Sequence, residues 1–158
     1  MSAEANAECV QRLYRALQRR DGAAMAACYA PQAHFRDPVF DLRAARIGAM
    51  WRMLCARGAD LRLEFGDVRA DATTGQARCQ AWYTFSASGR RVHNVIRAGF
   101  RFDDGLIVEH VDDFDFWRWS RQALGPAGLL LGWSPLLRNR VRREAERALA
   151  RFEAAAPD

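Results

Sequence analysis

The sequence is poor in several features that mark particular protein classes. It has no lysine. Its four cysteines (Cys9, Cys28, Cys55 and Cys79) lie 19, 27 and 24 positions apart, and this spacing fits neither a zinc site nor a redox-active pair. No apolar run reaches the ~18 residues that a membrane-spanning helix needs. The N-terminal residues MSAEANAEC also lack the basic and apolar regions of a secretory signal. We therefore expect a cytoplasmic protein with reduced, buried cysteines and no membrane span.

The charge of the chain is concentrated near its C-terminus. All 24 basic residues are arginine, against 19 acidic residues, which gives a net charge of +5. Residues 138–151 hold six arginines and two glutamates, so they account for +4 of that total. A protein built to bind nucleic acid spreads basic and aromatic residues over one face. No nucleic-acid partner is therefore expected.

What is present suffices for one folded domain. Half of the 158 residues are hydrophobic, and nine Phe, five Trp and three Tyr supply a core. Apolar residues at helical spacing predict helices over residues 3–20, 23–30, 44–58 and 135–155. Alternation predicts strands over residues 34–40, 61–70, 76–87, 90–102 and 106–114. Helices followed by an antiparallel meander define an α+β fold, in which the N-terminal helices cover the concave face of a curved sheet.

Residues 11–39 (QRLYRALQRRDGAAMAACYAPQAHFRDPV) resemble the opening of the nuclear-transport-factor-2-like superfamily, which includes ketosteroid isomerases and SnoaL-like proteins. Asp37-Pro38-Val39 carries most of the resemblance, and Gly89-Arg90, Phe100-Arg101-Phe102 and residues 104–107 and 110–114 continue it. The resemblance implies a cone-shaped domain over residues 1–118, with a bent sheet around an apolar cavity and a homodimer formed through the outer sheet face. Residues 119–158 form a C-terminal extension, an aromatic segment and a basic helix, which we expect to pack on the same domain.

Asp37 is the first candidate for chemistry. In the isomerases that the chain resembles, the aspartate before Pro-Val is the general base at the floor of the cavity. A carboxylate in an apolar cavity is desolvated, which raises its pKa and makes it a better base near neutral pH. The alternative is a structural role, in which the carboxylate of an Asp-Pro turn accepts hydrogen bonds from nearby backbone amides.

The rest of the isomerase site is not in place. The resemblance puts the oxyanion-binding tyrosine at Leu13 and the oxyanion-binding aspartic acid at Ala98, and neither side chain is a donor. Tyr14 lies one position further on, about 100° around the helix. Loss of one such donor costs about 3 kcal/mol of transition-state stabilisation, so a steroid isomerase acting through this pair is not expected. The Asp-Arg-Asp arrangement of limonene epoxide hydrolases is not evident either.

The last predicted strand offers other polar groups. Val108, His110, Asp112 and Phe114 alternate, and the resemblance turns their shared face toward the cavity. Together with Asp37, His110 and Asp112 give a histidine flanked by two carboxylates, which could shuttle a proton or donate to a carbonyl. The alternative is a buried, satisfied polar cluster that stabilises the sheet.

A ligand in the cavity would contact aromatic and amide side chains. No cofactor is expected, and no metal site, because alternation divides the acidic run 109–115 between two faces. The predicted function is binding of an apolar small molecule with a carbonyl or hydroxyl, with or without cofactor-free proton transfer of the isomerase, lyase or cyclase type. The alternative is a non-catalytic ligand-binding or dimeric association module that uses the outer face around Trp82 and Val95. The expected substrate-binding residues are Tyr14, Trp51, Tyr83, Asn94, Phe100 and Phe114.

The aromatic segment 115–134 permits two placements, as a lid over the cavity mouth or as a cover for a sheet edge. The final helix carries an apolar stripe opposite its arginines, which we expect to pack on the domain or on a partner subunit. Contact of Arg138, Arg140, Arg142 and Arg143 with an anionic membrane or a nucleic acid is the less favoured alternative.

Overall fold

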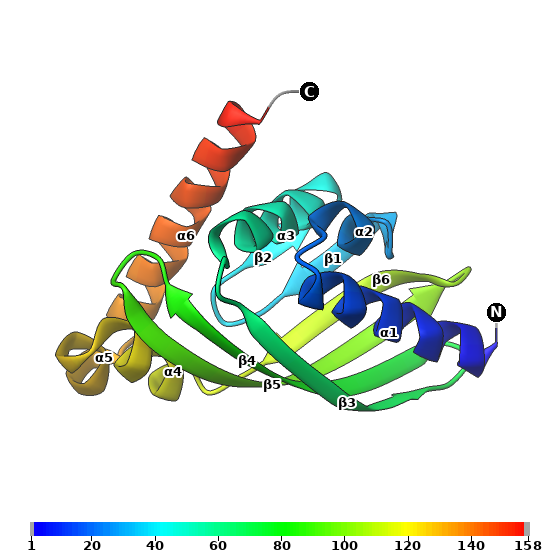
Figure 1. The fold of residues 1–158 in the computed structure, drawn as a ribbon, viewed down its shortest axis with the longest axis horizontal. Coiled ribbons are helices and arrows are strands. Elements are labelled where there is room, and N and C mark those ends of the chain that lie inside the picture. The colour runs from blue at the N-terminus through cyan, green and yellow to red at the C-terminus, as the bar shows by residue number, and fades with distance from the viewer. Residues whose placement is uncertain (1, 157–158) are drawn as a thin grey trace.

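One strongly curved sheet of six strands organises the fold. The computed structural model describes residues 2–156. In Figure 1 the sheet forms a trough below the N-terminal helices, and the long C-terminal helix rises at one end. In chain order the elements are α1 (Ala3–Gln18), α2 (Gly22–Ala26), β1 (Tyr29–Arg36), β2 (Asp41–Arg43), α3 (Ala45–Arg57), β3 (Arg62–Ala70), β4 (Thr74–Phe85), β5 (Arg90–Asp103), β6 (Leu106–Asp113), α4 (Phe116–Leu124), α5 (Pro126–Leu131) and α6 (Pro135–Ala155).

The sheet has the strand order β2-β1-β6-β5-β4-β3. Strands β3 to β6 form the expected antiparallel meander, and the turn between β5 and β6 has the left-handed backbone of a tight hairpin, with φ of 47° at Asp104 and 75° at Gly105. β1, however, pairs parallel with β6, so that Phe35 lies beside His110. The α+β class is confirmed. The sheet is mixed because α3 and four strands separate β1 from β6 in the chain, a connection long enough for a parallel pair.

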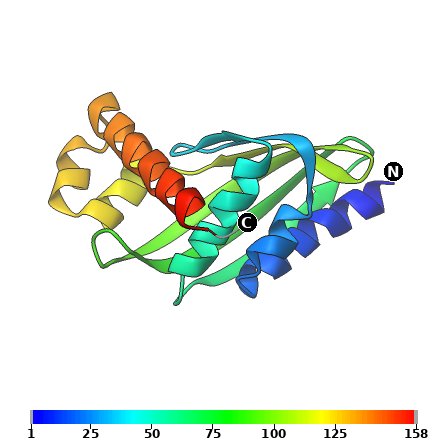
Figure 2. The same ribbon diagram turned by 90° about the horizontal axis from the view of Figure 1, so that it is seen from above.

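Helices α1 and α3 fill the concave face of the sheet. α1 packs on β3, and α3 packs on β1 and β2. Val10, Leu13, Tyr14 and Leu17, which form the predicted apolar stripe of α1, are all buried. Seen from above, both helices lie over the sheet and α6 runs beside α3 (Figure 2). Helix packing against the inner face therefore closes the cone along one side.

The second helix is shorter than the sequence pattern suggests. A helix over residues 23–30 was expected, but α2 ends at Ala26 and β1 begins at Tyr29. Pairing with β6 overrides local helical spacing, since Tyr29 lies beside Ile107 in the parallel ladder. The pairing turns the Tyr29 side chain toward the interior, where it can take part in a functional site.

Helix α4 covers an edge of the sheet. β6 ends at Asp113, which pairs with Arg97, so residues 90–96 of β5 have no strand beside them on that side among residues 2–156. The side-chain amide of Gln122 accepts a hydrogen bond from the backbone N–H of His93 (2.8 Å) and donates to its carbonyl (3.1 Å). The aromatic segment thus takes the edge-covering placement, one of the two that the sequence left open.

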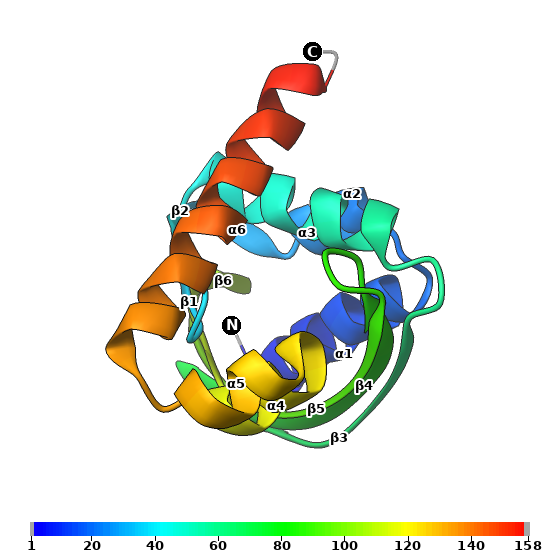
Figure 3. The same cartoon turned by 90° about the vertical axis from the view of Figure 1, so that its left-hand side faces the viewer.

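The C-terminal helices add a second apolar cluster to the core. Phe116 and Trp119 of α4 pack against Val92 of β5. Viewed from this end, α4 and α5 stand in front of β4 and β5 (Figure 3). α6 is anchored further along by Leu149, which is fully buried, and by ion pairs of Arg46 with two of its glutamates. No helix within residues 2–156 has both the length and the apolar character to cross a membrane.

Candidate functional site

Four buried side chains form a continuous chain of hydrogen bonds across the inner face of the sheet. The Trp51 indole of α3 donates to the Tyr29 hydroxyl of β1 at 3.0 Å. The Tyr29 oxygen lies 2.7 Å from Nδ1 of His110, and Nε2 of His110 lies 2.7 Å from the carboxylate of Asp112. The His110 ring is 1% exposed and is packed among aromatic rings. Parallel pairing of β1 with β6 brings these groups together.

The donors and acceptors of this chain fit a neutral His110. An indole N–H only donates, so the Tyr29 oxygen accepts from Trp51 and its own proton can go to Nδ1 of His110. An ionised Asp112 only accepts, so Nε2 carries the imidazole proton. Both imidazole nitrogens are then bonded to the protein, and neither is free for a ligand. The geometry therefore favours the structural alternative for His110, in which it orients Asp112.

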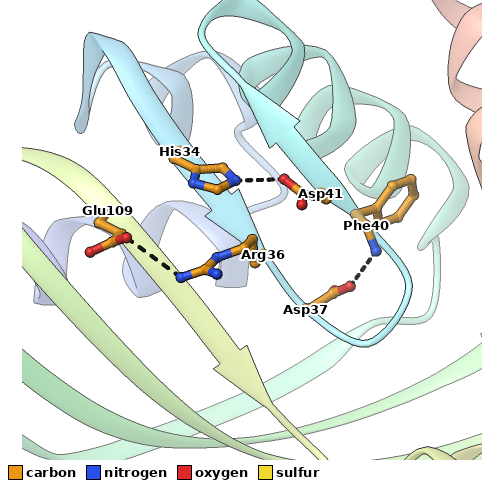
Figure 4. A network of polar contacts seen from close by, with 6 residues as sticks. All are labelled: His34, Arg36, Asp37, Phe40, Asp41 and Glu109. Atoms are coloured by element: carbon orange, nitrogen blue, oxygen red, sulfur yellow. Dashed lines mark hydrogen bonds and ion pairs between the residues drawn. The ribbon is translucent and has the colours of Figure 1, made fainter.

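Asp37 lies in the turn between β1 and β2. Its Oδ1 accepts hydrogen bonds from the backbone amides of Val39 (2.7 Å) and Phe40 (2.6 Å), the second of which is drawn in Figure 4. Burial nevertheless raises the pKa of Asp37 to about 7, a shift that the two amides oppose and the nearby Asp112 charge increases. The turn role and a role as a base are thus compatible, because Oδ1 serves the turn and Oδ2 makes no hydrogen bond within residues 2–156.

The hydroxyl of Tyr14 is buried without a partner. Its ring packs on Phe65 and Phe100, with centroids 5.3 and 6.4 Å away, and the hydroxyl makes no hydrogen bond to any group in residues 2–156. Burial, followed by the Asp112 charge, holds the pKa of Tyr14 well above its usual value. The charge of Asp112 thus acts on both Tyr14 and Asp37. A buried donor without an acceptor is where a ligand oxygen could be held.

Replacing Tyr14 by phenylalanine is expected to leave the free energy of unfolding unchanged, or to raise it by about 1 kcal/mol, because the variant removes an unpaired buried hydroxyl. The matched variant Tyr29→Phe is expected to lower it by about 1–3 kcal/mol, because His110 and Trp51 both lose a partner. Urea unfolding of both variants measures the difference. Equal destabilisation by the two would contradict an unpaired Tyr14.

The remaining expected ligand contacts fall into two groups. Asn94 is buried on the inner face of β5, and Phe100 packs on His110 with ring centroids 4.4 Å apart. Tyr83 and Phe114 instead pack against the cluster around α4. The Tyr83 hydroxyl accepts a hydrogen bond from the Trp119 indole (2.8 Å), and burial raises the pKa of Tyr83 to about 12. Trp51 is already engaged by Tyr29, so among the expected contacts the Tyr14 hydroxyl and the Asn94 side-chain amide are the polar groups that make no hydrogen bond within residues 2–156.

Sequence reasoning missed Tyr29 as a site residue. Assigning residues 23–30 to a helix concealed its place on β1. The only signal was weak: Tyr29 shares the odd parity of Phe35 and Asp37, but so does the exposed Pro31, and the β1–β6 register shifts between Tyr29 and His34.

A surface cleft of about 560 Å³ reaches Asp37 from outside. Residues of the β1–β2 turn line one side, and Arg142, Arg143 and Arg147 of α6 line the other. The Nε of Arg142 donates to the carbonyl of Pro38 (2.8 Å), which holds α6 against the turn. Its arginine-rich lining differs from the aromatic wall expected from the sequence. The cleft gives Asp37 access to molecules of ligand size.

The opposite side of β1 carries charged groups that pair with one another. His34 lies 2.5 Å from Asp41, and Arg36 lies 3.5 Å from Glu109 (Figure 4). Both pairs are on the outer side, away from the His110 chain. Across residues 2–156, no three His, Cys, Asp or Glu side chains gather in a way that could hold a metal ion.

The curved sheet, its helical cover and the polar groups on the inner face define a protein of the cone-shaped α+β class. The family profile of the SnoaL-like domain matches residues 10–110. The chain therefore belongs to the SnoaL-like domain family. A comparison with curated proteins finds no match.

Solved structures with the same fold have varied descriptions. An LEH-like epoxide hydrolase of M. tuberculosis is 20% identical with a TM-score of 0.66, and the match covers 82% of this chain and 97% of that one. A putative polyketide cyclase from Xanthomonas campestris is 19% identical with a TM-score of 0.64, over 78% and 99% of the two chains. A ketosteroid-isomerase-like protein from Catenulispora acidiphila in complex with trimethylamine is 12% identical with a TM-score of 0.67, over 81% and 98%. At these identities the comparisons establish the fold alone.

Proposed function

We propose that this protein binds an apolar small molecule bearing a carbonyl or hydroxyl and catalyses a cofactor-free proton transfer on it, with Asp37 as the base. The observation that carries the proposal is the situation of Asp37, a carboxyl with a pKa of about 7 that lines a cleft of about 560 Å³. A base with a pKa near the working pH is present in its active form and still takes up a proton readily.

In this mechanism Asp37 removes a proton from the carbon next to the ligand carbonyl. The electron pair of the broken C–H bond moves toward the oxygen. The Tyr14 hydroxyl, which is unpaired but does not line the cleft at Asp37, donates a hydrogen bond to the developing negative charge when the ligand extends from the cleft into the interior. Asp37 then returns the proton to another carbon in an isomerisation, or to a leaving group in a lyase reaction. His110 is a positioning residue, since its Nε2 orients Asp112.

The relatives support a small-molecule role in general terms. The structural neighbours include a putative polyketide cyclase and an LEH-like epoxide hydrolase, and one neighbour is in complex with a small amine. We also propose a cytoplasmic location and a homodimer through the outer sheet face, where Val95 and Val111 are 40% and 37% exposed. That face would serve the non-catalytic association module, the second candidate function.

The proposal is tested by a thermal-shift screen of ketones, steroids, phenols and polycyclic aromatics, each with and without a carboxylate because arginines line the cleft. A ligand at one hundred times its Kd should stabilise the wild type by about 2.7 kcal/mol. Tyr14→Phe should weaken the shift for carbonyl ligands, and Val95→Ser on the outer face should not. Absence of a shift with every class would favour the association module.

Catalysis is tested on a ligand found in this way by following deuterium exchange at the carbon next to its carbonyl. Asp37→Asn is expected to slow the exchange at least about a hundredfold, because an amide cannot accept the proton. Binding with no exchange above the solvent rate would leave a ligand-binding protein and contradict the proposed reaction.

A further inference from the structure

A compact group of large apolar side chains projects from the end of the molecule opposite the N-terminus. We call Leu129, Leu130, Leu131, Trp133 and Leu136 the apical patch; each is between 50 and 81% exposed. They fall within eight consecutive residues, over α5 and the first turn of α6. Figures 1 and 2 both place this segment at the far end of the sheet from α1. Clustered exposure of this kind marks an interaction surface.

The fold itself holds these side chains outward. The inner side of this segment carries glycines, and a Cβ at Gly128 would lie 1.9 Å from the carbonyl oxygen of Ser120. A Cβ at Gly132 would lie 2.1 Å from the Ser120 hydroxyl. Close contact with α4 therefore excludes larger residues on that side and leaves the leucines facing solvent. The Trp117 indole also donates to the carbonyl of Leu129 (3.1 Å), which ties α5 to α4.

The surroundings of the apical patch are basic. Between Asp115 and Glu144 the chain has six arginines and no acidic residue, and four of them, Arg118, Arg121, Arg138 and Arg140, do not line the Asp37 cleft. The Arg121 guanidinium lies 4.6 Å from the centre of the Trp117 ring, and Arg138 lies 5.0 Å from that of Phe116. A self-associated pair through this patch would bring two arginine-rich rims together, which repels. An anionic lipid surface instead offers negative headgroups to the rim and an apolar layer to the leucines.

We propose that the apical patch is a membrane-surface docking site for anionic phospholipids. The leucines enter the boundary between headgroups and acyl chains, Trp133 lies at that interface, and the arginines contact lipid phosphates. The protein lies on the surface without spanning it, and the cone with Asp37 stays in water. This interaction does not depend on the proposed proton transfer, since it uses none of the interior groups.

The test is flotation of the full chain with vesicles of phosphatidylcholine alone and of phosphatidylcholine with phosphatidylglycerol. The wild type is expected to bind the anionic vesicles at least about tenfold more tightly, with binding that weakens as salt is raised. The double variant Leu130→Ser/Trp133→Ser should lose at least about tenfold in affinity, and Arg118→Gln/Arg138→Gln should lose most of the preference for phosphatidylglycerol. Both variants should keep the wild-type melting temperature, because these side chains are exposed.

The matched control is Leu54→Ser, which removes an exposed apolar side chain of α3 outside both the apical patch and the proposed dimer face, and should bind as the wild type does. Asp37→Asn should also bind normally. The proposal is overturned if anionic vesicles do not retain the protein, or if the control weakens binding as much as the patch variant. It is equally overturned if sedimentation velocity shows an oligomer that Leu130→Ser/Trp133→Ser dissociates, since the patch would then serve self-association.

Discussion

Replacing His110 by leucine is expected to lower the free energy of unfolding by about 3–5 kcal/mol. The variant removes one partner of a buried pair, so the Asp112 carboxylate loses its hydrogen bond at 2.7 Å and the Tyr29 hydroxyl loses its acceptor. Removing a hydrogen-bond partner of a buried carboxylate has costs of this order because a desolvated, unpaired charge is left behind. Chemical unfolding monitored by circular dichroism measures the loss.

The control for this prediction is a second histidine–aspartate pair in the same protein. His34 lies 2.5 Å from Asp41 on the outer side of β1, where the Asp41 side chain is 71% exposed. His34→Leu is therefore expected to change the free energy of unfolding by less than about 1 kcal/mol. Equal losses of unfolding free energy in the two variants would contradict the view that burial makes the His110 hydrogen bonds stabilising.

The second large effect concerns pH. Asp37→Asn is expected to remove a decline in stability that the wild type shows between about pH 4 and pH 7. The pKa of Asp37 rises from 3.8 to about 7 on folding, chiefly through burial, so the native state binds the extra proton over that interval. The protonated Asp37 carboxyl therefore stabilises the fold fully at pH values below its pKa in the unfolded state. This stabilisation is lost as the pH rises through its pKa in the folded state.

The variant keeps a carbonyl that can accept the two turn hydrogen bonds, so its own stability should not vary with this titration. Relative to the wild type, the free energy of unfolding of Asp37→Asn should rise by on the order of 2 kcal/mol between pH 4 and pH 8. This is less than the free energy that corresponds to the whole pKa shift, because the cleft admits solvent to Asp37. Urea unfolding at a series of pH values measures this gain.

Asp71→Asn provides a matched comparison. Asp71 also accepts two turn amide hydrogen bonds, from Thr73 (2.8 Å) and Thr74 (2.7 Å), but it is exposed. These hydrogen bonds lower the pKa of Asp71 to about 2. Its contribution is therefore present above about pH 4 and is lost as pH falls toward 2. The decline in wild-type stability between pH 4 and pH 7 is assigned to Asp37. This assignment would be contradicted if Asp71→Asn changed the decline while Asp37→Asn left it intact.

Much of the fold could be predicted because its signals are local. The final helix was predicted over residues 135–155 and α6 occupies that range, since an apolar stripe and a proline at its start are visible in the sequence. The four strands of the meander begin and end within two residues of their predicted limits, because alternation and turn dipeptides act over short spans. The failure at residues 23–30 occurred where a distant strand, β6, determines the conformation.

The candidate site was only partly predictable for the same reason. The Asp37 turn follows from Asp-Pro, and the inward parity of His110 and Asp112 follows from alternation. The resemblance aligned the family's oxyanion-binding tyrosine with Leu13. The apolar stripe of the helix nevertheless put both Leu13 and Tyr14 on the buried face of α1. That the Tyr14 hydroxyl has no partner depends on side chains from other elements, so no sequence pattern contains it.

The sequence by itself determined the order of helices and strands, the turn at Asp37 and the accumulation of arginine near the C-terminus. The tertiary structure decided that β1 pairs parallel with β6, which joins Tyr29 to His110, and that Asp37 is buried enough for its pKa to reach about 7. It also decided that the leucines of α5 face solvent, because Gly128 is pressed against α4. Periodicity and turn propensity act between neighbours in the chain, whereas pairing, desolvation and exposure depend on groups that only folding brings together.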